Sequence, residues 1–136
     1  MKSITTDKAP KAVGPYSQAV TAGEFVFCSG QIALNPKTGE LVKGGIKAQT
    51  AQVLKNLNNV LQAAGASIAS VVSVNVYLAR MSDFADMNAE YAKIFSASVK
   101  PARVTVGVLE LPKNALVEIS CVAVKSARGR LALGQK

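Results

Sequence analysis

The sequence contains no histidine and no tryptophan, and only two cysteines occur among its 136 residues. Without histidine, the chain cannot form Ser-His or Cys-His nucleophile pairs, histidine-ligated zinc sites or histidine general bases. Two cysteines are also too few for a zinc or iron–sulfur site built from cysteine alone. Any catalysis must therefore use carboxylates, arginine, lysine, tyrosine, hydroxyl groups or backbone groups.

Long apolar runs are absent as well, since no stretch of the sequence approaches the ~20 residues needed to span a membrane. The N-terminal residues have neither the apolar core of a secretory signal nor the arginine-rich character of a transit peptide. Cys28 and Cys121 each lie inside a strand-like apolar run, which is typical of buried, reduced thiols. These features predict a cytoplasmic protein and leave a disulfide between the two cysteines open.

Acidic residues are few, because sixteen lysines and arginines stand against eight acids and give a net charge of +8. Half of this excess lies in residues 125–136, which carry four bases and no acid. The composition, 49% hydrophobic and 18% charged, predicts one folded domain over residues 1–124. We expect residues 125–136 to form a frayed basic tail, which favours a solvated surface over a nucleic-acid footprint.

The spacing of apolar residues predicts an α+β sandwich in the order ββαβαββ. The sheet is expected to be mixed and mostly antiparallel, with two helices packed on one face. Residues 2–5 are a candidate for a further short edge strand. The expected elements are a hairpin over 16–29, a helix over 46–64, a strand over 71–79, a helix that follows Ser82, and strands over 102–108 and 116–124.

The last two predicted strands carry the polar residues of most interest. In the first, the valines take one face and leave Arg103 and Thr105 on the other; in the second, Glu118 and Ser120 lie opposite the apolar residues. If both apolar faces join one core, these four polar side chains share the second face. Arg103 and Glu118 would then form a cross-strand salt bridge. Alternatively, they would form an arginine clamp for a carboxylate ligand beside an acid/base carboxylate.

Three further positions are candidates for ligand contact. Asn88 lies on the apolar stripe of the second helix, where its amide needs a partner in a loop, a neighbouring subunit or a ligand. Tyr16 follows a Gly-Pro turn, where its ring either packs or lines a site. Ser29 and Gly30 end a strand, and the glycine would let an anion approach the backbone closely.

Seven short motifs in order resemble the RidA (YjgF/YER057c/UK114) family of reactive-intermediate deaminases. The resemblance extends over essentially the whole chain up to about residue 124. The motifs are GPYSQA at 14–19, SGQI at 29–32, LVKGGI at 41–46, VLKNLNNVLQAAG at 53–65, KPAR at 100–103, LPK at 111–113 and VEISCVAV at 117–124.

The resemblance implies a subunit of the bacillus chorismate-mutase-like type that assembles into a homotrimer with active sites between subunits. It implies hydrolysis of 2-imino acids such as 2-iminobutanoate and 2-iminopropanoate to 2-oxo acids and ammonia. No cofactor, metal, membrane or nucleic acid is expected to take part.

Site residues follow from the same resemblance, position by position. The catalytic residues are expected to be Glu118, which would activate the attacking water, and Arg103, which would bind the substrate carboxylate. Thr105 stands where bacterial members often have cysteine, so a thiol role is in doubt, and Ser120 stands where many have a second glutamate. The remaining substrate-binding residues are expected to be Tyr16, Ser29, Gly30, Thr105 through its backbone N–H, and Asn88.

Two other classes of function stay open at this stage. The first is a non-catalytic trimeric module that binds small acids or partner proteins. The second is an RNA-directed translation inhibitor or endoribonuclease, which the charge of +8 favours. An aromatic content of only 5% and the absence of histidine speak against the RNA-directed reading.

Overall fold

The predicted order of elements is confirmed in the computed structural model, which describes residues 1–126. The short edge strand near the N-terminus is also present. The predicted basic tail lies, from residue 127 onward, outside the described residues. The strands and helices are β1 (Lys2–Ile4), β2 (Ala19–Ala22), β3 (Phe25–Gln31), α1 (Ile46–Ala63), β4 (Val71–Leu78), α2 (Phe84–Ile94), β5 (Ala102–Gly107) and β6 (Val117–Val124).

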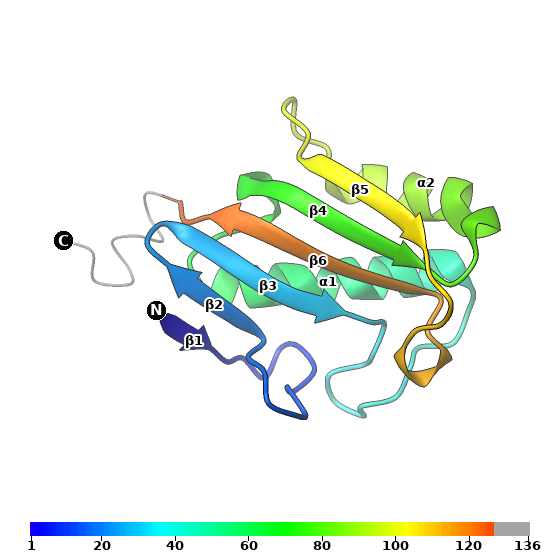
Figure 1. The fold of residues 1–136 in the computed structure, drawn as a ribbon, viewed down its shortest axis with the longest axis horizontal. Helices are drawn as coiled ribbons and strands as arrows, with labels where there is room; N and C mark the ends of the chain where they lie inside the picture. The colour runs from blue at the N-terminus through cyan, green and yellow to red at the C-terminus, as the bar shows by residue number, and fades with distance from the viewer. Residues whose placement is uncertain (127–136) are drawn as a thin grey trace.

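The strands form a single six-stranded sheet in the order β1-β2-β3-β6-β4-β5 (Figure 1). All neighbouring strands run antiparallel except β4 and β5, which are parallel. The sheet is therefore mixed and mostly antiparallel, as the sequence predicts, and β5 is an edge strand. The last strand of the chain, β6, lies at the centre of the sheet, where it pairs with both β3 and β4.

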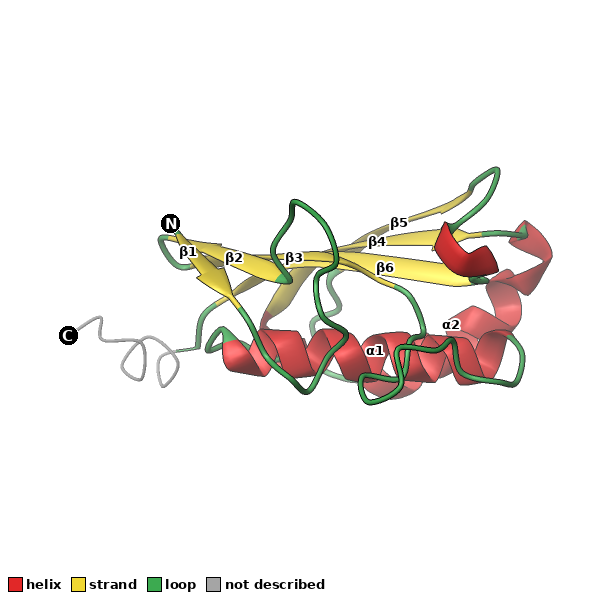
Figure 2. Ribbon diagram, turned by 90° about the horizontal axis from the view of Figure 1, so that it is seen from below, coloured by secondary structure: helices red, strands yellow, loops and turns green. Residues whose placement is uncertain are grey.

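Both helices lie on one face of the sheet, which we call the helix face (Figure 2). Neither α1 nor α2 covers the opposite face, which we call the open face. Across residues 1–126, the helices are too short or too polar to span a membrane. The apolar stripe of α1 packs against the sheet and builds the core with fully buried side chains, which include Val53, Leu57, Val60, Leu61, Val26, Val74, Val76 and Ile119.

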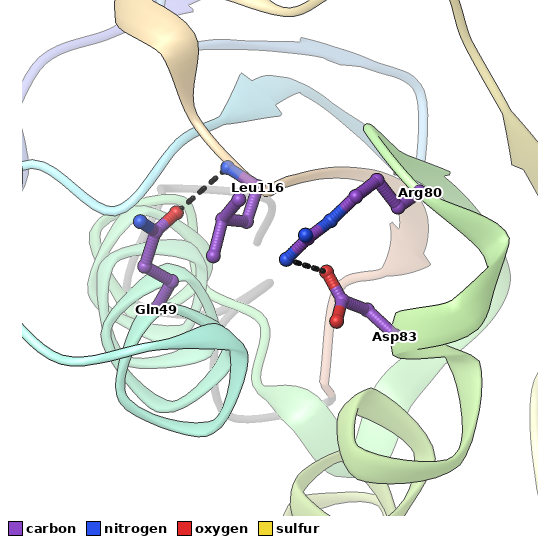
Figure 3. Close-up of polar contacts among 4 residues, drawn as sticks. All are labelled: Gln49, Arg80, Asp83 and Leu116. Carbon is purple, nitrogen blue, oxygen red and sulfur yellow. Dashed lines mark hydrogen bonds and ion pairs between the residues drawn. The ribbon is translucent and has the colours of Figure 1, made fainter.

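Two polar contacts lie near the end of the sheet at which β6 begins (Figure 3). The backbone N–H of Leu116 donates a 2.9 Å hydrogen bond to Oε1 of Gln49, a buried residue in the first turns of α1. Arg80 and Asp83 form a 3.5 Å ion pair across the turn between β4 and α2. The start of β6, and with it Glu118, is thus tied to the N-terminal end of α1.

One prediction about the sheet is wrong: Arg103 and Thr105 do not share a face with Glu118. In the register of β4 and β5, Arg103 lies opposite Val74 and Thr105 opposite Val76. Both of these valines are completely buried on the helix face. Since residues that pair across neighbouring strands point to the same side, Arg103 and Thr105 also belong to the helix face.

The valines of β5 lie on the open face instead, where Val104 and Val106 are 56% and 40% exposed. Val106 pairs with Tyr77, and Tyr77 pairs in turn with Glu118. Glu118 and Ser120 therefore share the open face with the β5 valines, whereas the sequence pattern assigns those valines to the core. The physical reason is that β5 is an edge strand, and alternation along a strand does not tell which of its two faces another layer covers.

Candidate functional site

A cavity of about 690 Å³ beside Glu118 brings together most of the site residues that the sequence predicts. Its lining includes Tyr16, Ser29, Gly30 and Glu118, which come from three separate segments of the chain. Glu118 is the only acidic side chain among the described residues that line it. Apolar side chains from the loops make up much of the remaining wall, among them Val13, Ile32, Leu34 and Pro112.

Gly30 allows the Glu118 carboxyl group to lie against β3. A Cβ atom on residue 30 would lie 2.9 Å from Cδ of Glu118 and would overlap its carboxylate oxygen. The register of β3 against β6 shifts between Cys28 and Gln31, so the strand is irregular at this glycine. A larger residue here would displace either β3 or the carboxyl group.

Ser29 and Tyr16 are held by their own local contacts. The hydroxyl of Ser29 donates a 2.6 Å hydrogen bond to the backbone oxygen of Ser17, and its N–H donates to the backbone oxygen of Gln18. Tyr16 follows Gly14, whose φ of 138° only glycine adopts readily. The Tyr16 side chain is 54% exposed at the rim of the cavity. Ser29 thus shapes the wall, while Tyr16 is free to meet a ligand.

Burial raises the pKa of Glu118 above the ordinary glutamate range. No ion pair to Glu118 forms within residues 1–126 to offset this effect. Lys113 also lines the cavity, in a turn where its backbone has a φ of 56°. A lone, partly desolvated carboxyl group of this kind can accept and return a proton nearer to neutral pH than a solvated one.

Arg103 belongs to a second cluster, at the edge of the sheet next to α2. Its Nη1 donates a 2.7 Å hydrogen bond to Oδ1 of Asn88. Its Cζ lies 4.7 Å from the ring centroid of Tyr91 and 5.6 Å from that of Phe84. Arg103 remains exposed and lines a cavity of about 420 Å³ with Asn88, Tyr91 and Lys100. The amide of Asn88, whose partner the sequence leaves open, is thus engaged by arginine.

Thr105 lies two residues beyond Arg103 on the same face of β5. Its hydroxyl oxygen is buried and has no hydrogen-bond partner among the described residues. The structure therefore places the predicted site residues in two clusters, which we name half-sites: Glu118 with Tyr16, Ser29 and Gly30 at the open face, and Arg103 with Asn88 near Thr105 at the helix face. One chain does not bring them together.

Two residues of these half-sites are absent from the sequence-based set. Tyr91 is not among the predicted site residues, although its spacing of three residues from Asn88 places both on one side of a helix. Lys113 was noted only as part of the LPK motif. Neither residue carries a local signal that separates it from packing or solvent exposure, since its role depends on which strand lies beside it.

The two cysteines are free and lie directly opposite each other across β3 and β6. A hydrogen bond with Cys28, together with burial, raises the pKa of the Cys121 thiol. Cys121 is therefore a neutral thiol at physiological pH, and Cys28 is likewise buried in the core. In residues 1–126, acidic and cysteine side chains form no group of three or more that could hold a metal ion.

Comparison with known proteins gives consistent matches over almost the whole chain. Residues 6–125 match the family model described as Endoribonuclease L-PSP. A RutC family protein from Pyrococcus horikoshii is 57% identical, over 90% of this chain and 96% of its own length. A protein from Mus musculus named 2-iminobutanoate/2-iminopropanoate deaminase is 45% identical, over 91% of each chain. The crystal structure of E. coli TdcF with bound serine superposes with a TM-score of 0.88 at 38% identity, covering 93% of this chain and 100% of that one.

Proposed function

We propose that this chain, which belongs to the Endoribonuclease L-PSP (RidA) family, hydrolyses small 2-imino acids to 2-oxo acids and ammonia. Substrates of the size of 2-iminobutanoate and 2-iminopropanoate are the proposed class. The observation that carries the proposal is the single carboxyl group of Glu118, partly desolvated and placed against Gly30 in a cavity rimmed by Tyr16. The name of the mouse relative supports the same reaction.

The proposed reaction needs one group that handles protons and one that orients the substrate. Glu118 accepts a proton from water as the water oxygen bonds to the carbon of the protonated imine and the C=N electron pair moves to nitrogen, which gives a tetrahedral amino alcohol. The carboxyl group then returns this proton to nitrogen, the C–N bond breaks with its electron pair on nitrogen, the hydroxyl proton passes to the Glu118 carboxylate, and the 2-oxo acid and ammonia leave. Because an imine is already electrophilic, an enzyme can accelerate this step by positioning the substrate and the water.

Arg103 is the proposed binding group for the substrate carboxylate. The planar guanidinium can hold a carboxylate through two parallel hydrogen bonds, which a lysine ammonium cannot reproduce. Since Arg103 and Glu118 lie on opposite faces of one chain, the proposed site takes them from two copies. Tyr16, Ser29 and Gly30 would come from the copy that provides Glu118.

We propose that these copies form a homotrimer, as the family resemblance implies. Support comes from the open face, which exposes apolar side chains that a single chain leaves in water. Sheet packing through this face would also bring the exposed edge strand β5 toward a neighbouring copy. The exposed apolar side chains on this face include Phe25, Phe27, Val104 and Val106.

The test is an assay in which an amino-acid oxidase generates the imine and semicarbazide traps whatever remains. The wild-type protein is expected to shorten the lifetime of the imine, and both Arg103→Ala and Glu118→Gln are expected to abolish most of this effect. Glu110→Gln, which changes an exposed acid outside the cavity, is the matched control and is expected to behave as wild type. A folded wild-type protein that leaves the imine lifetime unchanged would contradict the proposal.

A binding module for small acids is the second candidate, because the TdcF structure contains bound serine, a small molecule with a carboxylate. A wild-type protein that binds a 2-oxo acid but does not hydrolyse the imine would favour that candidate. For either function, a cytoplasmic location stays a prediction from the sequence.

A further inference from the structure

The aromatic ring of Tyr91 lies directly beside the guanidinium of Arg103. Tyr91 is only 8% exposed, and its ring stacks on Phe95 with 4.4 Å between the ring centroids. Arg103 Cζ lies 4.7 Å from the Tyr91 centroid, within the range of a cation–π interaction. The ring is thus a fixed surface, because the core of the protein packs against its other side.

We propose that Tyr91 is a positioning residue for Arg103, and that its aromatic face holds the guanidinium plane ready for the substrate carboxylate. This inference rests on the proposed function and deepens it. Tyr91 acts through Arg103 and does not touch the reacting atoms. The working part of the side chain is the ring rather than the hydroxyl group.

Some groups of the Arg103 guanidinium contact protein side chains, and others remain available to a ligand. The guanidinium carbon lies 4.7 Å from the ring centroid of Tyr91 and 5.6 Å from that of Phe84, and Asn88 accepts a hydrogen bond from Nη1. No acid within residues 1–126 forms an ion pair with Arg103. The donors on Nε and Nη2 are thereby left for a ligand, and two donors on one edge are what bidentate carboxylate binding requires.

The Tyr91 hydroxyl group leaves the positive charge of Arg103 available to a ligand. Its oxygen is buried and makes no hydrogen bond of full geometric quality among the described residues, although the Arg103 side chain lies close enough to interact with it. Burial raises the pKa of Tyr91, and the charge of Arg103 together with this weak hydrogen bond only partly opposes the rise. The phenol therefore stays neutral, so it does not cancel the charge that Arg103 offers to a carboxylate.

The inference distinguishes two substitutions of one residue. Tyr91→Phe keeps the aromatic face and removes only the hydroxyl group with its weak contact to Arg103, whereas Tyr91→Leu removes the face. We expect Tyr91→Leu to raise the dissociation constant of 2-oxobutanoate roughly 3- to 30-fold, the size of a cation–π contact. Tyr91→Phe is expected to stay within about 2-fold of wild type, because the quadrupole of the ring remains. Titration calorimetry measures both values.

A double-mutant cycle tests whether Tyr91 acts through Arg103. In an Arg103→Ala background, adding Tyr91→Leu is expected to produce no further loss of binding. In the imine assay, Tyr91→Leu is expected to raise KM more than it lowers kcat, a split that a general loss of structure would not give. If Tyr91→Leu binds 2-oxobutanoate as wild type does, or if Tyr91→Phe is as weak as Tyr91→Leu, the inference is wrong.

A measurement that does not need the leucine variant covers the case in which it fails to fold. The ring current of Tyr91 is expected to shift the Nε–H proton resonance of Arg103 upfield in wild type and in Tyr91→Phe. A resonance at the position of a solvent-exposed arginine in both proteins would overturn the inference. A wild type that shows this shift and binds 2-oxobutanoate but leaves imine unhydrolysed would contradict only the proposed function.

Discussion

The Glu118 half-site and the Arg103 half-site are built by opposite physical means. Glu118 is a partly buried carboxyl group that forms no ion pair within residues 1–126, and burial raises its pKa. Arg103 keeps its exposure to water but is restrained by a hydrogen bond from Nη1 and by an aromatic face. In the proposed reaction, the partly buried carboxyl group suits proton transfer and the restrained guanidinium suits orientation of the substrate.

The same contrast appears in the backbone that carries each group. Glu118 lies in β6, at the centre of the sheet between β3 and β4. Arg103 lies in β5, which has a neighbour on one side only and is parallel to it. A central strand can surround a carboxyl group with a cavity wall, whereas an edge strand leaves an arginine accessible to a ligand or to another copy.

The substitution expected to have the largest effect is Glu118→Gln. Removal of the proton-handling carboxyl group is expected to lower kcat by roughly 100- to 10,000-fold, the usual range for general acid–base groups. Binding of 2-oxobutanoate is expected to change little, because Arg103 remains. Loss of binding with kcat preserved would reverse the assignment of the two half-sites.

Glu118 also gives a pH prediction with a defined sign. Its pKa is raised in the folded protein, so the folded state holds the proton more tightly than an unfolded chain does, where a glutamate titrates near ~4.3. The tighter binding of this proton stabilises the folded state fully below the pKa of the unfolded chain. The stabilisation is lost as the pH rises through the higher pKa of the folded protein. Glu118→Gln is therefore expected to be more stable than wild type at pH 7 and not at pH 3.5. Thermal melts at both pH values measure this difference.

Arg103→Ala is expected to have the next largest effect, and it should appear in binding. Loss of a bidentate, charge-assisted contact is expected to lower kcat/KM roughly 100-fold, with little change in melting temperature because the side chain is exposed. Arg103→Lys should not restore activity, since a lysine lacks the planar fork. Arg80→Ala, which removes an exposed arginine outside both half-sites, is the matched control.

Gly30→Ala tests the geometry of the Glu118 half-site alone. The added methyl group overlaps the carboxyl group and is expected to lower kcat about 10-fold and stability by about 1–3 kcal/mol. Gly45→Ala is the control, because a Cβ there meets nothing within 4 Å and the glycine has a φ of −80°. Equal behaviour of the two variants in the assay and in thermal melts would show that residue 30 does not constrain Glu118.

Asn88→Ala is expected to have the smallest effect. It removes one of the restraints on Arg103 and leaves the Tyr91 face in place, so KM should rise roughly 3- to 10-fold with kcat nearly unchanged. Steady-state kinetics with wild type and Asn88→Asp separate the outcomes. The aspartate would form an ion pair with Arg103, and we expect it to weaken substrate binding more than alanine does. A stronger loss in kcat than in KM would indicate direct contact between Asn88 and the reacting atoms.

Much of the fold could be predicted because its elements carry strong local patterns. The apolar stripe of α1 has a helical period, and β6 alternates over its full length between buried and partly exposed residues. The Glu118 half-site was also accessible from the sequence, since Tyr16, Ser29, Gly30 and Glu118 meet in one cavity. Their roles in the reaction stay predictions.

The orientation of β5 could not be predicted from the local sequence pattern. Its alternation of valine with Arg103 and Thr105 is the same whichever face the helices cover, and the sequence favours the wrong one. Tyr91 poses the same difficulty, because an aromatic residue on a helix stripe looks identical whether it meets leucine or arginine.

Composition excluded histidine chemistry, periodicity predicted the order of the elements, and the resemblance to the family indicated Glu118 and Arg103 as candidate groups. Tertiary structure decided that these two groups lie on opposite faces, that burial raises the pKa of Glu118, and that Tyr91 flanks Arg103. The physical reason is one of range. Propensity and alternation act within a few neighbouring residues, whereas desolvation, strand register and cation–π contact depend on segments far apart in the chain.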